Sequence, residues 1–280
     1  MRKIMFSGLI IFLVFFIGAT VCWFTFEKQN YEETKINKSY SNSNFKNISI
    51  NTEYANVKVV NGSKFKVKYN GDNKVNLDKK NKTLKISEVK NVNRGYAINL
   101  NPFRKDDNQI VIEMPNIKLN TFSYVSRGGN FNIDNITTNH LKILSTNSHM
   151  DLKNLSVNDS DIKANSSQLS IKNSTLKNNH VNLNNGFINV YNSNISDSIF
   201  LLGEGDIHFN NMSSRNDIKA STKKGDIHYS YKDKPENTLL KLQPGKGKSL
   251  IENKHFHESK VGKSDNILEF YTVDGDIVIK

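Results

Sequence analysis

Two pairs of side chains in the C-terminal half have the types and spacing that could hold a metal ion or perform acid–base chemistry. Asp206 and His208 recur as Asp226 and His228, twenty residues later, within the same Gly-Asp-Ile-His sequence. Imidazole and carboxylate groups bind zinc or copper, and paired carboxylates cleave polysaccharides. A metal site needs a third ligand, which the sequence does not supply. We therefore predict a structural role for both pairs, with no metal, no cofactor and no enzymatic activity.

Lysines near the N-terminus form a second distinctive group. The net charge is +12, and residues 1–120 hold most of the excess, with twenty basic against ten acidic residues. Such lysines attract anionic lipid head groups or anionic wall polymers, but they also keep exposed strand edges from pairing. Both interpretations stay open for the candidate anion contacts, Lys64, Lys66, Lys68, Lys79, Lys80 and Lys82. Nucleic acid is disfavoured as a partner because few aromatic residues interleave with these lysines.

A repeat of nineteen residues predicts the elements that position these side chains. Its first part is an alternating apolar segment that begins at Phe131, Met150, Leu169, Ile188 and Ile207. A second apolar position has the same period, at Tyr124, Ile143, Ile162, Val181 and Phe200. Two short strands per repeat leave no room for a helix, and a fixed period means that each unit stacks on copies of itself. The sequence thus predicts an all-β, parallel β-helix-like solenoid, right-handed by the general preference for such connections.

An asparagine closes each of the five alternating segments. Asparagine tolerates the left-handed backbone conformation, and its amide can donate a hydrogen bond to a neighbouring coil. We therefore predict that these residues form a structural ladder at one corner of the solenoid, made of Asn135, Asn154, Asn173, Asn192 and Asn211.

The repeat also sets the expected boundaries of the solenoid domain. We expect this domain to span 45–280, with regular coils over 121–230. The pattern is lost over 232–266, where proline and glycine indicate an irregular loop. A final coil over 267–280 is expected to cap the exposed edge of the stack.

The N-terminal 26 residues predict a transmembrane signal anchor. Arg2 and Lys3 precede an uncharged apolar run, Ile4 to Phe26, that is long enough to cross a bilayer. A cleaved signal peptide and a lipoprotein signal at Cys22 are less consistent with this run, because it continues past the small residues that cleavage would need. The positive residues predict a cytoplasmic N-terminus and an extracellular C-terminal domain, joined by a tether over 27–44.

Several strands resemble a known family. They include Ile48-Ser49-Ile50, Ala55 to Val59, Leu84-Lys85-Ile86 and Ile110 to Pro115, together with the recurring Gly-Asp-Ile segments. Over roughly 45–280 the chain is similar to bacterial putative-adhesin proteins with β-strand repeats, of the membrane-anchored type found beside cell-envelope stress genes in Gram-positive bacteria. The resemblance implies a β-solenoid display or adhesion module, with envelope-stress membrane proteins as candidate partners.

Two function hypotheses follow. The first is a membrane-tethered binding or scaffold module, a putative adhesin or an accessory to the cell-envelope stress response. The alternative is a wall-polysaccharide-binding protein or polysaccharide-active enzyme, which needs a groove lined with acids and aromatic rings. Most aromatic residues of the regular coils, including Phe131, Phe187 and Phe209, fall at or beside core positions, whereas Tyr191 points outward. Exposed rings are thus expected to be scarce, which favours the binding module.

Overall fold

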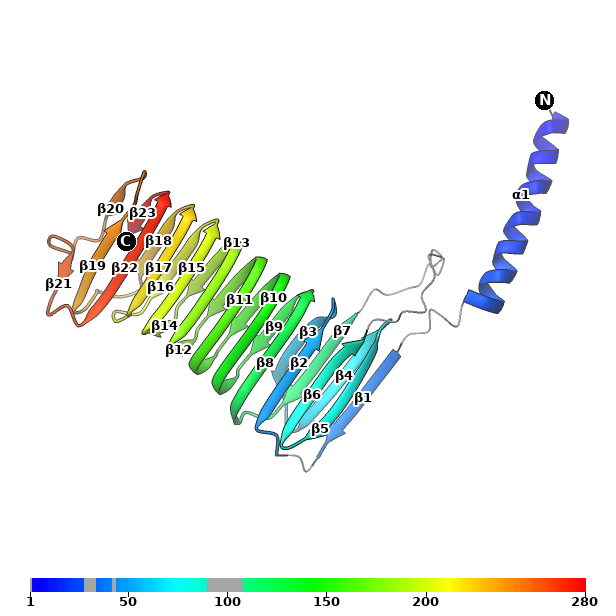
Figure 1. The fold of residues 1–280 in the computed structure, drawn as a ribbon, viewed down its shortest axis with the longest axis horizontal. Coiled ribbons are helices and arrows are strands. Elements are labelled where there is room, and N and C mark those ends of the chain that lie inside the picture. Colours follow the sequence, from blue (N-terminus) through cyan, green and yellow to red (C-terminus); the bar gives the residue numbers. More distant parts are fainter. Residues whose placement is uncertain (1, 28–33, 42–43, 90–107) are drawn as a thin grey trace.

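An apolar helix begins the chain. The computed structural model describes residues 2–27, 34–41, 44–89 and 108–280 (Figure 1). Helix α1 (Arg2–Cys22) continues into a π-helical segment, η1 (Trp23–Glu27). The apolar segment Ile4–Phe26 has 23 residues and a mean hydropathy of 2.6, and none of it is buried against other parts of the protein. At 1.5 Å per residue it extends about 35 Å, which is long enough to span the hydrocarbon core of a bilayer.

Parallel strands in register form the body of the protein. One long side, which we call face A, contains most of β8 (Lys118–Gly128), the middle parts of β10 (Thr137–Lys153) and β11 (Ser156–Lys172), the first part of β13 (Asn179–Tyr191), then β15 (Ser198–Glu204) and β17 (Ile218–Lys224). Ile143 pairs with Tyr124 on one side and with Ile162 on the other. The nineteen-residue stack predicted from the sequence is confirmed.

The second long side, face B, packs against face A (Figure 1). It contains β9 (Phe131–Asp134), the last parts of β10, β11 and β13, then β16 (Ile207–Met212) and β18 (Ile227–Tyr231). A short third side, face C, begins each coil and includes β12 (Thr175–Lys177) and β14 (Asn194–Ser196). Each regular coil therefore runs through faces C, A and B in turn, with no helix between them.

Alternation along each strand places one set of side chains in a continuous core. Ile143 and Ile162 of face A and Leu152 and Ile171 of face B are each about 1% exposed or less. Aromatic rings extend the core, and the rings of Tyr124 and Phe131 stack at 3.8 Å between centroids. Each buried side chain of this size contributes about 1.5–3 kcal/mol. The core therefore stabilises the domain without any disulfide, since the single cysteine, Cys22, lies in α1.

Asparagine makes the turn from face B to face C. All five asparagines of the predicted ladder have positive φ, between 46° and 62°. The amide of Asn192 donates to the amide oxygen of Asn173 at 2.8 Å. The amides of Asn154 and Asn211 instead donate to Asp134 and to the hydroxyl of Tyr191, each in the preceding coil. The left-handed turn thus recurs in every regular coil, whereas the side-chain partner varies.

Glycine makes the turn from face A to face B in several coils. Gly186, Gly205 and Gly225 have φ of 130°, 126° and 135°. A Cβ atom at Gly205 would lie 1.7 Å from the carbonyl oxygen of Gly186 in the preceding coil. Only glycine permits this backbone conformation and this close approach together.

The N-terminal end of the solenoid is built from strands that are not in sequence order. The coil of β2 (Asn47–Thr52) and β3 (Asn56–Asn61) lies between the β8–β9 coil and a layer formed by β6 (Thr83–Val89) and β7 (Gln109–Met114). Antiparallel strands close the end: β5 (Lys74–Lys80) pairs with β6, and β4 (Phe65–Gly71) pairs with β7. The outermost strand is β1 (Thr34–Tyr40), which pairs with β4. The expectation that 27–44 is only a tether was therefore wrong for 34–40, while 28–33 and 42–43 lie outside the described residues.

The C-terminal end also departs from sequence order. Strands β22 (Asn266–Asp274) and β23 (Ile277–Ile279) pair with β17 and β18. The segment that precedes them supplies β19 (Thr238–Gln243) and β20 (Ser249–Ile251), which pair with the far sides of β22 and β23. A two-residue strand, β21 (Lys260–Val261), pairs antiparallel with β19. The prediction of a capping coil over 267–280 was therefore wrong: this coil is internal, and the segment taken for an irregular loop supplies the outermost one.

Replacing a core residue with a charged one tests the assignment of inside and outside. We expect Ile171→Asp to lower the free energy of unfolding by at least about 3 kcal/mol, because a lone carboxylate would be buried without a partner. Asn189→Asp, on the outer side of face B, should have a small effect. Urea unfolding followed by circular dichroism measures both, and equal stabilities would contradict the assignment.

Candidate functional site

The aspartates proposed as weak metal ligands belong to the turn from face A to face B. A carboxylate oxygen of Asp206 accepts from the backbone N–H of Asp226 at 2.9 Å, and Asp226 accepts from Asp276 at 2.7 Å. Asp276 in turn accepts from the backbone N–H of Lys248 at 2.8 Å. Each aspartate thus links its coil to the next, which gives the repeated Gly-Asp pair a structural role.

The two histidines lie side by side on the outer side of face B. The rings of His208 and His228 are 5.0 Å apart between centroids and lie at 77° to each other. They line a depression of about 260 Å³ with Ser230 and Lys280. Burial and the charge of His228 lower the pKa of His208, while Asp206 and Asp226 act in the opposite sense. No group of three or more histidine, cysteine, aspartate or glutamate residues suited to a metal ion occurs among the described residues.

The six candidate lysines all lie at the N-terminal end of the solenoid, but on two of its sides. Lys64 precedes β4, and Lys66 and Lys68 alternate with buried residues along it. Glu113 of β7 pairs with Lys68, and this hydrogen bond, together with the nearby Lys66 and Lys64, lowers the pKa of the Glu113 carboxyl. The acid therefore stays ionised and offsets part of the positive charge on this side.

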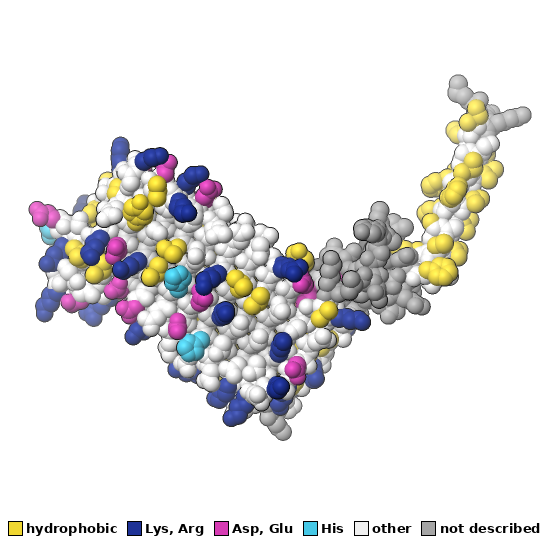
Figure 2. All heavy atoms as spheres, viewed as in Figure 1, with side chains coloured by type: hydrophobic (Ala, Val, Ile, Leu, Met, Phe, Trp, Pro, Cys, Tyr) yellow, Lys and Arg dark blue, Asp and Glu magenta, His cyan; other side chains and the backbone are white. Residues whose placement is uncertain are grey.

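The other three candidate lysines belong to the hairpin of β5 and β6. Lys79, Lys80 and Lys82 are exposed, and the ammonium of Lys79 lies 5.6 Å from the centre of the Phe45 ring. Phe45 packs edge-to-face on Phe65 of β4, with 5.0 Å between ring centroids. This aromatic contact joins the two lysine groups across the end of the core. We call the end of the solenoid that carries these six lysines the basic end. Basic side chains are visible near both ends of the solenoid in Figure 2.

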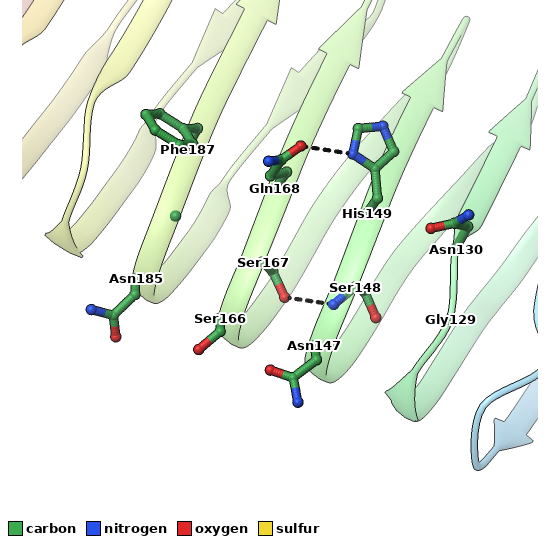
Figure 3. A pocket seen from close by; sticks show the side chains of 11 residues that line it. Gly129, Asn130, Asn147, Ser148, His149, Ser166, Ser167, Gln168, Asn185 and Phe187 are labelled. Atoms are coloured by element: carbon green, nitrogen blue, oxygen red, sulfur yellow. Dashed lines mark hydrogen bonds between the residues drawn. The ribbon is translucent and has the colours of Figure 1, made fainter.

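A groove that the sequence did not reveal runs along the turn from face A to face B. Its volume is about 480 Å³, and it crosses the coils of β9, β10, β11 and β13 (Figure 3). Two columns of side chains line it, Asn147, Ser166 and Asn185, and His149, Gln168 and Phe187. Phe187 is 45% exposed, so the expectation that it lies at or beside the core was wrong. Alternation along face B places Phe187 outward, since its neighbour Ile188 is buried. Only the alternation of face A, where Leu183 is buried, would place it inward if continued across the turn, and Gly186 with its positive φ interrupts that alternation.

Comparison with known proteins places this architecture in a family. The family model described as Toastrack DUF4097 matches residues 45–280. The chain belongs to the Toastrack DUF4097 family. The match covers every strand of the solenoid except β1, and it agrees with the resemblance to putative adhesins drawn from the sequence. No curated protein matches the chain.

Solved structures described as putative adhesins share the Toastrack fold. One, from Bacteroides fragilis, is 18% identical, with a TM-score of 0.50, and the match covers 89% of this chain and 99% of that one. Another, from Parabacteroides distasonis, is 15% identical, with a TM-score of 0.53, and the match covers 89% of this chain and 98% of that one. At these identities the similarity establishes the fold alone.

The pKa of His208 tests the geometry of the histidine pair. We expect His228→Asn to raise the pKa of His208 toward its ordinary value of 6.5, because one of the two causes of the shift is removed. In the parent, the unfolded chain binds a proton at His208 more readily than the folded protein does. The contribution of neutral His208 to the free energy of unfolding is therefore complete above pH 6.5 and is lost as the pH falls through the lower folded-state pKa. A titration of the imidazole resonances by NMR measures the change, with His149→Asn as a distant control. An unchanged pKa of His208 in His228→Asn would contradict the pairing.

Proposed function

We propose that this Toastrack protein is a membrane-tethered, extracytoplasmic binding module whose basic end docks on phosphate-bearing anions of the cell envelope. The observation that carries the proposal is the short connection between the apolar helix and β1, which is the outermost strand at the lysine-bearing end of the solenoid. Six residues separate Glu27 of η1 from Thr34 of β1. In any conformation these residues extend at most about 25 Å, so strand β1 stays close to the surface of a bilayer that α1 spans.

The charge at this end supports the proposal. Residues 34–89 contain twelve lysines and four acidic residues. One of the acids, Glu88, is buried and accepts backbone hydrogen bonds from Glu53, Tyr54 and Ala55, so it adds little to the surface potential. Lysines near an anionic surface each contribute about 1 kcal/mol to binding, within roughly a Debye length of about 8 Å. The short connection to α1 would keep this end near the bilayer, with Lys35 of β1 nearest to the connection and Lys66, opposite Ser39, roughly 17 Å along the strand from Thr34.

The orientation follows from the ends of α1. Arg2 and Lys3 precede the apolar segment, and positive residues of this kind favour the cytoplasmic side. The solenoid would then lie outside the cell as an extracellular, single-pass membrane protein. The solved structures described as putative adhesins are an analogy for a surface-binding role, and we include that role in the proposal.

Binding to a soluble phosphate polymer tests the role of the basic end. The full chain, in phosphatidylcholine nanodiscs, should bind poly(glycerol phosphate) more weakly as salt rises, because charge pairing is screened. Changing all six lysines of the basic end to glutamine should weaken binding at least tenfold. The matched control changes six exposed lysines of the C-terminal end to glutamine: Lys223, Lys232, Lys234, Lys241, Lys254 and Lys263.

The two lysine variants have equal net charge, so only the location of the charge differs between them. Adding phosphatidylglycerol to the nanodiscs should reduce polymer binding by the parent if lipid head groups occupy the basic end. Equal polymer binding by the parent and the basic-end variant, or equal losses in the two variants, would contradict the proposal.

A further inference from the structure

The groove along the turn from face A to face B has a lining of polar and aromatic residues without formal charge. None of the described residues that line it is lysine, arginine, aspartate or glutamate. Asn147, Ser166 and Asn185 stand in register on neighbouring coils, as Figure 3 shows. Successive coils lie roughly 4.8 Å apart, so the groove offers a hydrogen-bonding amide or hydroxyl at each coil spacing. A long, uncharged ligand with regularly spaced polar groups fits this arrangement.

Exposed aromatic rings flank the groove at both ends. Phe187 lines one end and is 45% exposed, whereas Phe131 and Phe209 are fully buried. At the other end Tyr54 is 60% exposed and lies beside Gly128, where an added Cβ would meet the Tyr54 ring at 3.0 Å. Four coil spacings separate the two rings, a distance of roughly 19 Å. Two exposed rings on one edge of a protein that otherwise buries most of its large rings indicate a surface suited to stacking.

The Tyr54 turn is held in place from inside the domain. Glu88 of β6 is 6% exposed, and one of its oxygens accepts from the backbone N–H groups of Glu53, Tyr54 and Ala55 at 2.7, 3.1 and 3.0 Å. Glu53 also pairs with Arg127 at 3.0 Å, which neutralises the charges nearest to this end. A fixed backbone at this turn reduces the conformational freedom that is lost when a ligand stacks on Tyr54.

We propose that this groove binds a neutral polysaccharide chain that lies along the edge of the solenoid. Asparagine, serine and glutamine side chains match the hydroxyl and acetamido groups of sugars as donors and acceptors. The electron-rich faces of Phe187 and Tyr54 suit the C–H faces of pyranose rings. The uncharged lining disfavours anionic polymers and nucleic acids.

Binding without cleavage follows from the acids nearby. Glycoside hydrolysis needs two carboxyl groups on either side of the scissile bond. The column of Phe187 continues into Asp206, whose carboxylate already accepts a backbone hydrogen bond from Asp226. The column of Asn185 continues into Glu204, whose carboxylate accepts from the Asn185 amide and pairs with Lys224. The groove therefore acts as a binding surface, distinct from the basic end, and it holds its ligand by stacking and hydrogen bonding.

Titration with defined oligosaccharides tests the inference. The full chain, in phosphatidylcholine nanodiscs, is titrated with tetra-N-acetylchitotetraose and with cellotetraose, followed by saturation-transfer NMR and calorimetry. We expect binding of at least one neutral tetrasaccharide. Phe187→Ala should weaken it at least tenfold, and Phe187→Trp should retain it because a flat ring remains.

Tyr271→Ala is the matched control, because Tyr271 is also 45% exposed but lies on face A away from the groove. It should bind like the parent, as should the variant with the six lysines of the basic end neutralised, which separates this inference from the proposed function. No binding of either tetrasaccharide at millimolar concentration, or equal affinities of Phe187→Ala and the parent, would overturn the inference.

Discussion

The hydrogen bonding of each coil to the next, in parallel and in register, is the constraint on which the rest of the molecule depends. It fixes neighbouring backbones at about 4.8 Å and turns each position of the repeat into a column of side chains. Inward columns in the middle of each face are apolar, as at Ile143 and Ile162, whereas buried serine, threonine and asparagine side chains lie beside the turns. Corner columns must allow a turn and a close backbone approach, which only a few residue types permit. Asn173 at one corner and Gly205 at another meet these requirements in different ways.

The same constraint creates the surfaces on which function is proposed. A column repeats its chemistry for as long as the stack lasts, so a groove along an edge offers similar groups at equal intervals. Where a column changes residue type, that part of the surface becomes chemically distinct. Phe187 adds a ring where neighbouring coils have Gln168 and His149. The ends of the stack are not repetitive at all. The N-terminal end is closed by antiparallel strands, and it holds the lysines of the basic end and β1, the first strand after the apolar helix.

The periodic parts of the structure could be predicted from the sequence, because a local pattern determined them. The strands around Ile143 and Ile171 and the turn at Asn173 follow from the nineteen-residue spacing alone. The strand order at the two ends could not be predicted, because which segment pairs with β17 depends on long-range complementarity that local alternation does not encode. The groove was missed for a related reason: alternation assigns Phe187 to the core side only if the strand continues straight, and the turn at Gly186 reverses that assignment. Gly186, directly before Phe187, was the available signal, because a glycine inside a strand pattern often marks an interruption of the strand.

Distances between coils most directly test the parallel, in-register stack and its order at the C-terminal end. Asn132 and Val278 occupy one column on face B, six coil spacings apart, and Leu250 follows Val278 by one more spacing. Pairs of spin labels on the full chain, with Cys22 replaced by serine, allow these separations to be measured by pulsed electron paramagnetic resonance. A parallel stack with β20 outermost gives a distance of roughly 29 Å from Asn132 to Val278 and roughly 34 Å from Asn132 to Leu250. A distance to Leu250 equal to or shorter than that to Val278 would contradict it.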